Sequence, residues 1–140
     1  MPSYPLKPLD AQFGREVVGL DVAAGLDAET AAALKADWLE HGILVFRGIG
    51  TSPEIQLALS RCFGELEPHP IELFRLPSHP ELILLSNENG PLAPIYDFGE
   101  GPVTQCIPWH TDLAFKTTPN AGALLRMVRK PEQGGRTGWL

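Results

Sequence analysis

The sequence predicts an α+β fold that is mostly β, contained in a single domain over residues 1–140. Fourteen prolines and fourteen glycines among 140 residues indicate many turns and an all-β or mixed fold. Apolar runs such as Ile43–Phe46 and Leu82–Leu85 have the length of short buried strands. Two stretches, 28–40 and 53–63, repeat apolar residues at the helical period.

The N-terminal third has the pattern of a strand, a helix and a second strand. Residues 1–14 hold three prolines in the first eight positions and predict an irregular or edge strand, whereas Arg15–Asp21 predicts a short strand. Asp27 suits the N-cap of a helix over 28–40, which ends at Gly42. The apolar face of this helix comprises Ala31, Leu34 and Trp38, at positions i, i+3 and i+7.

A second helix is predicted from Ser52 to Gly64. The Ser52 hydroxyl can cap the first turn, and Pro53 suits the first helical position. Because Cys62 belongs to the apolar stripe, we expect it to be a thiol in the core. The stripe comprises Ile55, Ala58, Leu59, Cys62 and Phe63.

The second half of the chain predicts strands separated by long loops. Residues 65–80, with four prolines, form a predicted loop, and 82–85 a buried strand. Residues 87–108 hold three glycines and four prolines and predict a long irregular stretch, where a lid over a substrate is expected. Residues 121–129 are strand-like, and 136–140 begin another strand.

Composition excludes several classes of partner and location. The net charge is −6 and there is no basic run, so neither nucleic acid nor an anionic membrane is an expected partner. Two cysteines without CxxC spacing predict a reducing cytoplasm. The N-terminus lacks the apolar core of a signal peptide, and no apolar run approaches the ~20 residues of a membrane span.

His110 and Asp112 are the candidate metal ligands. In an extended strand, side chains at i and i+2 leave the same face, so an imidazole nitrogen and a carboxylate oxygen can converge on one ion. A His and a carboxylate are two of the three ligands of the facial triad that holds Fe(II). The alternative is a half-buried His110 hydrogen-bonded to Asp112. A zinc hydrolase is a weaker interpretation, because the sequence has no HExxH motif.

The chain resembles the TauD/TfdA family of Fe(II)- and 2-oxoglutarate-dependent dioxygenases. The resemblance is carried by residues 109–139, WHTDLAFKTTPNAGALLRMVRKPEQGGRTGW, and by GILVFR at 42–47, FGEL at 63–66 and His69-Pro70. It implies a double-stranded β-helix, a jelly-roll core of the cupin type, with N-terminal helices and incomplete in this chain. It also implies Fe(II), 2-oxoglutarate as co-substrate, O2, and hydroxylation of an unactivated C–H bond of a small organic substrate.

The resemblance assigns roles to four residues. His110 and Asp112 match the first two iron ligands of the family. Thr137 matches a threonine that binds the distal carboxylate of 2-oxoglutarate, and without the resemblance it is a plain strand threonine. His69 matches a histidine that contacts substrate, and otherwise it is a loop histidine before a proline.

Two residues depart from the taurine-oxidising members of the family. Cys106 replaces an Asn and Glu72 replaces a Tyr, both of which help to hold a sulfonate in those members. A carboxylate at position 72 would repel a sulfonate at close range. Taurine is therefore not the expected substrate.

The family's second His ligand and the Arg that pairs with 2-oxoglutarate lie far beyond the position that matches Leu140. We therefore expect one of three situations: the chain is the N-terminal part of a longer protein, it is a truncated product completed by a partner, or it is inactive. The third would make it a non-catalytic fragment or interaction module. An unpaired sheet edge at the end of the chain would favour a homo-oligomer.

Overall fold

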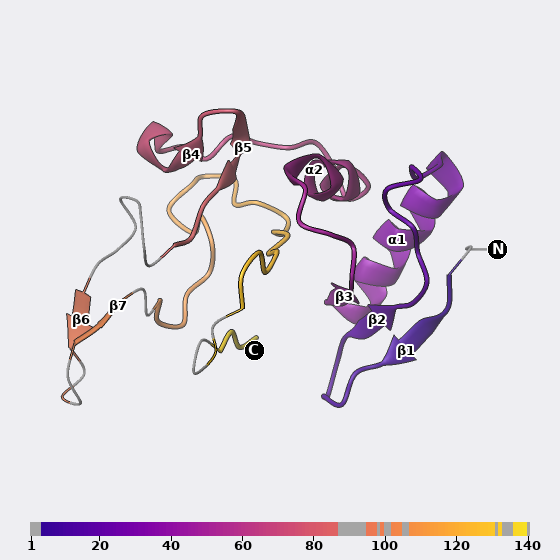
Figure 1. The fold of residues 1–140 in the computed structure, drawn as a ribbon, viewed down its shortest axis with the longest axis horizontal. Coiled ribbons are helices and arrows are strands. Elements are labelled where there is room, and N and C mark those ends of the chain that lie inside the picture. The colour runs from indigo at the N-terminus through magenta and orange to yellow at the C-terminus, as the bar shows by residue number, and fades with distance from the viewer. Residues whose placement is uncertain are drawn as a thin grey trace. The chain divides into compact units, whose positions relative to one another are not determined.

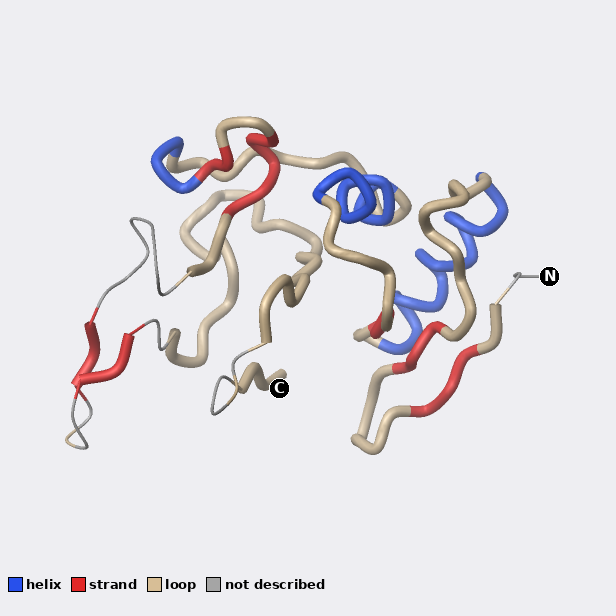
Figure 2. The backbone as a smooth tube through the Cα atoms, in the orientation of Figure 1, coloured by secondary structure: helices blue, strands red, loops and turns tan. Residues whose placement is uncertain are grey.

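A computed structural model describes residues 4–86, 95–97, 99, 102–104, 107–130, 132 and 136–139 (Figure 1). The chain divides into two compact units, residues 1–65 with 124–140 and residues 66–123. All of its strands are short, and loops make up much of the chain between them (Figure 2). The prediction of a single domain over 1–140 stays a prediction.

The first unit contains a three-stranded sheet. Its order is β1 (Leu6–Pro8), β2 (Arg15–Val17) and β3 (Leu44–Phe46). Strand β1 is antiparallel to β2, and β3 is parallel to β2, so α1 forms the crossover between β2 and β3. Proline at the end of β1 is tolerated because β1 is an edge strand, as the N-terminal prolines predicted.

Helix α1, Ala28–His41, has the predicted caps. The Asp27 carboxylate accepts a hydrogen bond of 2.7 Å from the Thr30 N–H, which lowers the pKa of Asp27 because the bond favours its charged form. At the other end Gly42 has φ 74°, and its N–H donates to the Trp38 carbonyl over 2.8 Å. Both ends of the predicted helix are confirmed.

Helix α2, Pro53–Arg61, begins as predicted and ends earlier. The Ser52 hydroxyl accepts from the Glu54 N–H over 3.2 Å, and Pro53 occupies the first turn. The helix ends before Gly64, however, and Leu57 is buried where Ala58 was expected to be. The apolar stripe is therefore correct at Leu59 and wrong at Ala58.

The core of the first unit joins the sheet to both helices. The helix residues Leu34 and Leu59 are both fully buried. A T-shaped contact between the rings of Trp38 and Phe63, with centroids 5.6 Å apart, adds to this packing. The buried cluster comprises Tyr4, Val17, Val22, Leu34 and Leu59. One burial-driven core therefore holds the two helices and the sheet together.

Cys62 packs against this core, as predicted, and is a free thiol. Burial raises the pKa of Cys62, because an apolar environment disfavours the thiolate. We expect the native thiol to react with iodoacetamide roughly tenfold more slowly than the same thiol in denaturant. The rate is measured in a Cys106→Ser background near neutral pH, and equal rates in the two solvents would contradict the burial.

The second unit contains two hairpins and a short helical turn. A 3₁₀ turn at Glu72–Phe74 leads into β4 (Arg75–Leu76), which pairs with β5 (His79–Ile83). The predicted loop over 65–80 is therefore wrong in its second half. The predicted buried strand over 82–85 is also displaced, because the strand ends at Ile83 and Leu84 and Leu85 are exposed.

A further hairpin interrupts the stretch that was predicted to be irregular. Strands β6 (Ile95–Asp97) and β7 (Pro102–Thr104) pair antiparallel. Most of the rest of 87–108, including Cys106, lies outside the described residues. The lid that was expected over residues 87–108 therefore stays a prediction.

The segments predicted as strands over 121–129 and 136–140 are not strands among the residues that the structure describes. The Gln56 amide donates to the Leu124 carbonyl over 3.1 Å and ties this segment to α2. Beyond Leu124 the large apolar side chains are exposed, so no buried sheet face forms from them among the described residues. They are Leu125, Met127, Val128 and Trp139. In the described part of the chain, no helix is long and apolar enough to cross a membrane.

Candidate functional site

Asp112 begins a turn and His110 lies in the irregular segment before it, so neither residue is in an extended strand. The turn continues through Leu113, which has φ 50°, and Lys116, whose N–H donates to the Leu113 carbonyl over 2.9 Å. A positive φ is strained for leucine and costs about 1 kcal/mol or more. The two side chains nevertheless converge: His110 Nε2 lies 2.8 Å from Asp112 Oδ1.

The other ring nitrogen of His110 is fixed by the backbone. Nδ1 lies 2.8 Å from the Pro108 carbonyl, which can only accept, so Nδ1 carries a proton. Nε2 is then the nitrogen available to a metal, and a carbonyl behind a histidine is the usual support for a metal ligand. Without a metal both nitrogens face acceptors, and the bonds to Pro108 and then to Asp112 raise the pKa of His110.

The separation of the two donor atoms fits a metal site. Two neighbouring ligands of an octahedral ion, each about 2.1 Å from the metal, lie about 3 Å apart. The observed 2.8 Å between His110 Nε2 and Asp112 Oδ1 is close to this value, and it is also the length of the hydrogen bond that joins the two groups here, as the alternative interpretation expected. Both side chains are about half exposed, at 49% and 56%, so a ligand can reach them from solvent.

The third ligand is not found in the described part of the chain. No group of three or more His, Cys, Asp or Glu residues there could hold a metal ion. The remaining two histidines, His41 and His79, are both partly buried. The donor set of the described residues is therefore one imidazole and one carboxylate.

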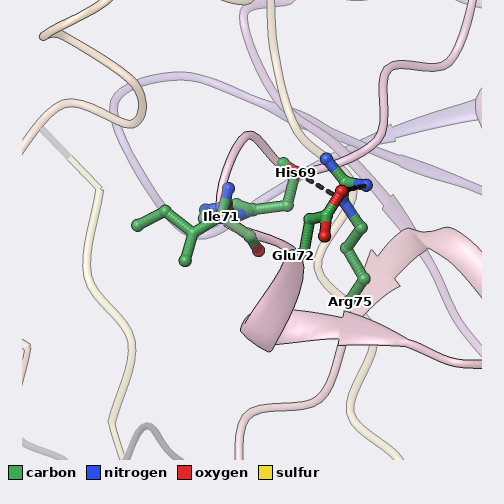
Figure 3. Close-up of polar contacts among 4 residues, drawn as sticks. All are labelled: His69, Ile71, Glu72 and Arg75. Atoms are coloured by element: carbon green, nitrogen blue, oxygen red, sulfur yellow. Dashed lines mark hydrogen bonds and ion pairs between the residues drawn. The ribbon is translucent and has the colours of Figure 1, made fainter.

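His69 belongs to the same compact unit as His110 and Asp112 and precedes the 3₁₀ turn (Figure 3). Nearby Glu72 pairs with Arg75, with 3.3 Å between Oε1 and Nη1. The negative charge of Glu72, which was expected to repel a sulfonate, is therefore partly offset by the guanidinium of Arg75. Sequence reasoning missed Arg75, although its i, i+3 spacing from Glu72 was a visible signal.

An ion pair connects the segment before His69 to the turn after Asp112. Lys116 Nζ lies 2.5 Å from Glu67 Oε2. The two residues are 49 positions apart, so no local pattern in the sequence could have predicted the pair. Its effect is to hold the two segments of this unit that carry the predicted site residues.

Thr137 lies in the other compact unit, in an irregular and exposed segment. Its predicted role toward 2-oxoglutarate stays a prediction. Cys106, the other departure from the taurine-oxidising members, lies outside the described residues.

Comparison with known families decides the ancestry of the chain. Residues 4–140 match the family described as "Taurine catabolism dioxygenase TauD, TfdA family". The chain belongs to the TauD/TfdA family. The resemblance predicted from the H-x-D turn and its neighbours is thereby confirmed over nearly the whole chain.

Two characterised dioxygenases are similar along almost all of this chain. A (S)-phenoxypropionate/alpha-ketoglutarate-dioxygenase of Sphingobium herbicidovorans is 30% identical, over 99% of this chain and 45% of its own length. An alpha-ketoglutarate-dependent sulfate ester dioxygenase of Pseudomonas putida is 27% identical, over 94% of this chain and 40% of its own. The chain thus spans less than half the length of these relatives.

A solved structure of a TauD/TfdA protein is similar over a shorter range. A taurine dioxygenase from Burkholderia xenovorans is 34% identical, with a TM-score of 0.48, over 56% of this chain and 28% of its own.

Proposed function

We propose that the complete protein is an Fe(II)- and 2-oxoglutarate-dependent dioxygenase that hydroxylates an unactivated C–H bond of a small organic substrate. One observation carries the proposal: in a chain of this family, His110 Nε2 and Asp112 Oδ1 lie 2.8 Å apart, with His110 Nδ1 held by the Pro108 carbonyl. A His and a carboxylate at this separation are suited to Fe(II).

The residues of this chain have distinct roles in the proposal. His110 and Asp112 hold the iron, and the Pro108 carbonyl fixes the ring so that Nε2 faces it. Thr137 binds the distal carboxylate of 2-oxoglutarate, and His69 contacts the substrate. Iron and 2-oxoglutarate, when bound, supply the oxidising chemistry of O2, while the protein orders the reactants and excludes water.

The relatives suggest which substrates to test first. Their names specify phenoxypropionate, 2,4-dichlorophenoxyacetate and sulfate esters, all small molecules that carry an oxyanion. We propose that the complete protein acts on a carboxylate or sulfate ester of this kind, because the ion pair of Glu72 with Arg75 reduces the charge repulsion that such an oxyanion would otherwise meet. Succinate release with each compound in turn measures this activity.

A second candidate function follows from the donor set. Two protein ligands hold a metal weakly, and the described residues offer two. A chain of these 140 residues alone would then be a non-catalytic fragment or interaction module. The two candidate functions predict different metal contents and different chain lengths for the native protein.

Two measurements separate the candidates. The first is the intact mass of the protein from its native source, because a mass well above that of 140 residues means that further ligands can follow. The second is anaerobic titration of the purified native protein with Fe(II) and 2-oxoglutarate. Stoichiometric binding of both Fe(II) and 2-oxoglutarate would support the dioxygenase function, and the absence of binding would contradict it.

Metal binding should depend on pH through His110. The bonds to Pro108 and Asp112 raise the pKa of His110 above its ordinary value, so the proton is kept to a higher pH than in a free histidine. Metal binding requires His110 Nε2 without its proton. The apparent metal affinity should therefore fall as the pH is lowered through the raised pKa. Below that pKa the affinity should drop by about tenfold for each pH unit.

Titration with Mn(II), followed by electron paramagnetic resonance, measures this dependence. A decline that begins above about pH 6.5 is expected, because that is the ordinary pKa of histidine. Affinity that stays constant down to about pH 6 would contradict the role of His110. An Asp10→Asn variant, which changes an exposed carboxylate of the other compact unit, is the control and should leave the pH of the decline unchanged.

Completion of the fold and the cellular context also belong to the proposal. We infer that the small sheets are the N-terminal part of a jelly roll of the cupin type. A cytoplasmic location, a small-molecule substrate, no nucleic-acid or membrane partner, and a possible homo-oligomer stay predictions from the sequence.

A further inference from the structure

The Arg75 side chain makes two polar contacts with the segment that carries His69 (Figure 3). Its Nε donates to the His69 carbonyl over 2.6 Å, and its Nη1 pairs with Glu72 Oε1 over 3.3 Å. The Arg75 side chain is 28% exposed, whereas that of Glu72 is 86% exposed. Arg75 is therefore the less exposed member of the pair.

The backbone of Ile71 fixes which nitrogen of His69 carries the proton. The Ile71 N–H lies 3.1 Å from His69 Nδ1, and the Ile71 carbonyl lies 3.2 Å from the same atom. That carbonyl already accepts from the Phe74 N–H over 3.2 Å, whereas the Ile71 N–H needs an acceptor. Nδ1 therefore accepts, and the neutral ring carries its proton on Nε2.

The ring of His69 is also held from its side. Its centroid lies 5.3 Å from that of Phe74, with the planes tilted by 54°. In the described part of the chain, Nε2 has no hydrogen bond of its own, so the ring presents one N–H donor. Such a donor suits an acceptor group of a ligand, such as a carboxylate, sulfate or carbonyl oxygen.

We propose that Arg75 is a positioning residue for the substrate-contacting His69. By binding the His69 carbonyl it sets the backbone between His69 and Ile71, and this backbone selects the Nε2–H form of the ring. By pairing with Glu72 it offsets a negative charge three residues from that donor. The role toward substrate rests on the proposed function, while the role toward the ring of His69 does not.

The first test reads the ring directly, by long-range ¹H–¹⁵N correlation spectra of the histidines in the complete native protein. Wild type should show His69 with Nε2 protonated and Nδ1 bare. Arg75→Gln should lose this single form and give averaged nitrogen shifts, whereas Glu72→Gln should keep it. A single Nε2–H form in folded Arg75→Gln, or its loss in Glu72→Gln, would overturn the proposal.

Two further variants keep the test decisive. Arg61→Gln, an exposed arginine at the end of α2, is the matched control and should leave the His69 signals unchanged. If Arg75→Gln does not fold by circular dichroism, Arg75→Lys takes its place, because lysine keeps the charge but lacks the Nε–H that binds the His69 carbonyl. Retention of the single form in Arg75→Lys would then overturn the proposal.

The second test concerns substrate. With a turned-over oxyanion substrate, Arg75→Gln should raise KM by roughly three- to tenfold with little change in kcat, since it disturbs a binding contact. An unchanged KM would overturn the link to substrate. If no compound is turned over, the proposed function fails, and the spectra still decide whether Arg75 positions His69.

Discussion

Asp112→Ala should abolish 2-oxoglutarate-dependent turnover of the complete protein and weaken metal binding by at least about 100-fold, with little loss of fold. The carboxylate supplies one of two donor atoms that lie 2.8 Å apart, and alanine leaves His110 as the single ligand of this pair. Little stability is lost because the Asp112 side chain is 56% exposed and contributes no packing. Anaerobic titration with Mn(II) and an assay for succinate measure the two effects.

The matched control is Asp10→Ala, which removes an exposed carboxylate from the other compact unit. It should leave metal affinity and turnover unchanged and so exclude a general effect of net charge. Turnover by Asp112→Ala equal to that of wild type would disprove the assignment of the metal pair. Loss of turnover in both variants would equally contradict it, because Asp10 has no place in the proposed site.

The two helices could be predicted because their signals are local. Asp27, Ser52 and Gly42 act within four residues of their own positions, so their caps are visible in the sequence. Strands depend on partners far along the chain, and these were predicted less well. Apolar residues predicted a buried strand at 82–85 and a strand at 121–129, yet Leu84 and Leu125 are exposed among the described residues.

The two residues of the candidate metal pair were proposed from the sequence, whereas their local geometry was not predicted. The spacing of His110 and Asp112 suggested a strand, whereas an irregular segment that enters a turn at Asp112 carries the two side chains, which lie in hydrogen-bond contact. The Pro108 carbonyl that orients His110 is a backbone group, so residue type cannot reveal it. The ion pair between Glu67 and Lys116 joins residues 49 positions apart and likewise depends on the fold.

Leu34→Ala should lower the free energy of unfolding of the first compact unit by about 2–5 kcal/mol. Leu34 is fully buried, in the cluster where α1 meets β2 and α2. Alanine loses the transfer free energy of the removed carbons and leaves a cavity that the sheet and helices fill only in part. Urea denaturation followed by circular dichroism measures the loss as a lower midpoint.

Leu39→Ala makes the same chemical change on the same helix at a side chain that is 70% exposed. Alanine and leucine are both strong helix formers, so this variant should stay within about 0.5 kcal/mol of wild type. The difference between the two variants then isolates burial from helix propensity. A loss at Leu34 no larger than that at Leu39 would contradict the core that joins α1 to the sheet. Metal affinity of folded Leu34→Ala should be unchanged, because His110 and Asp112 belong to the other compact unit.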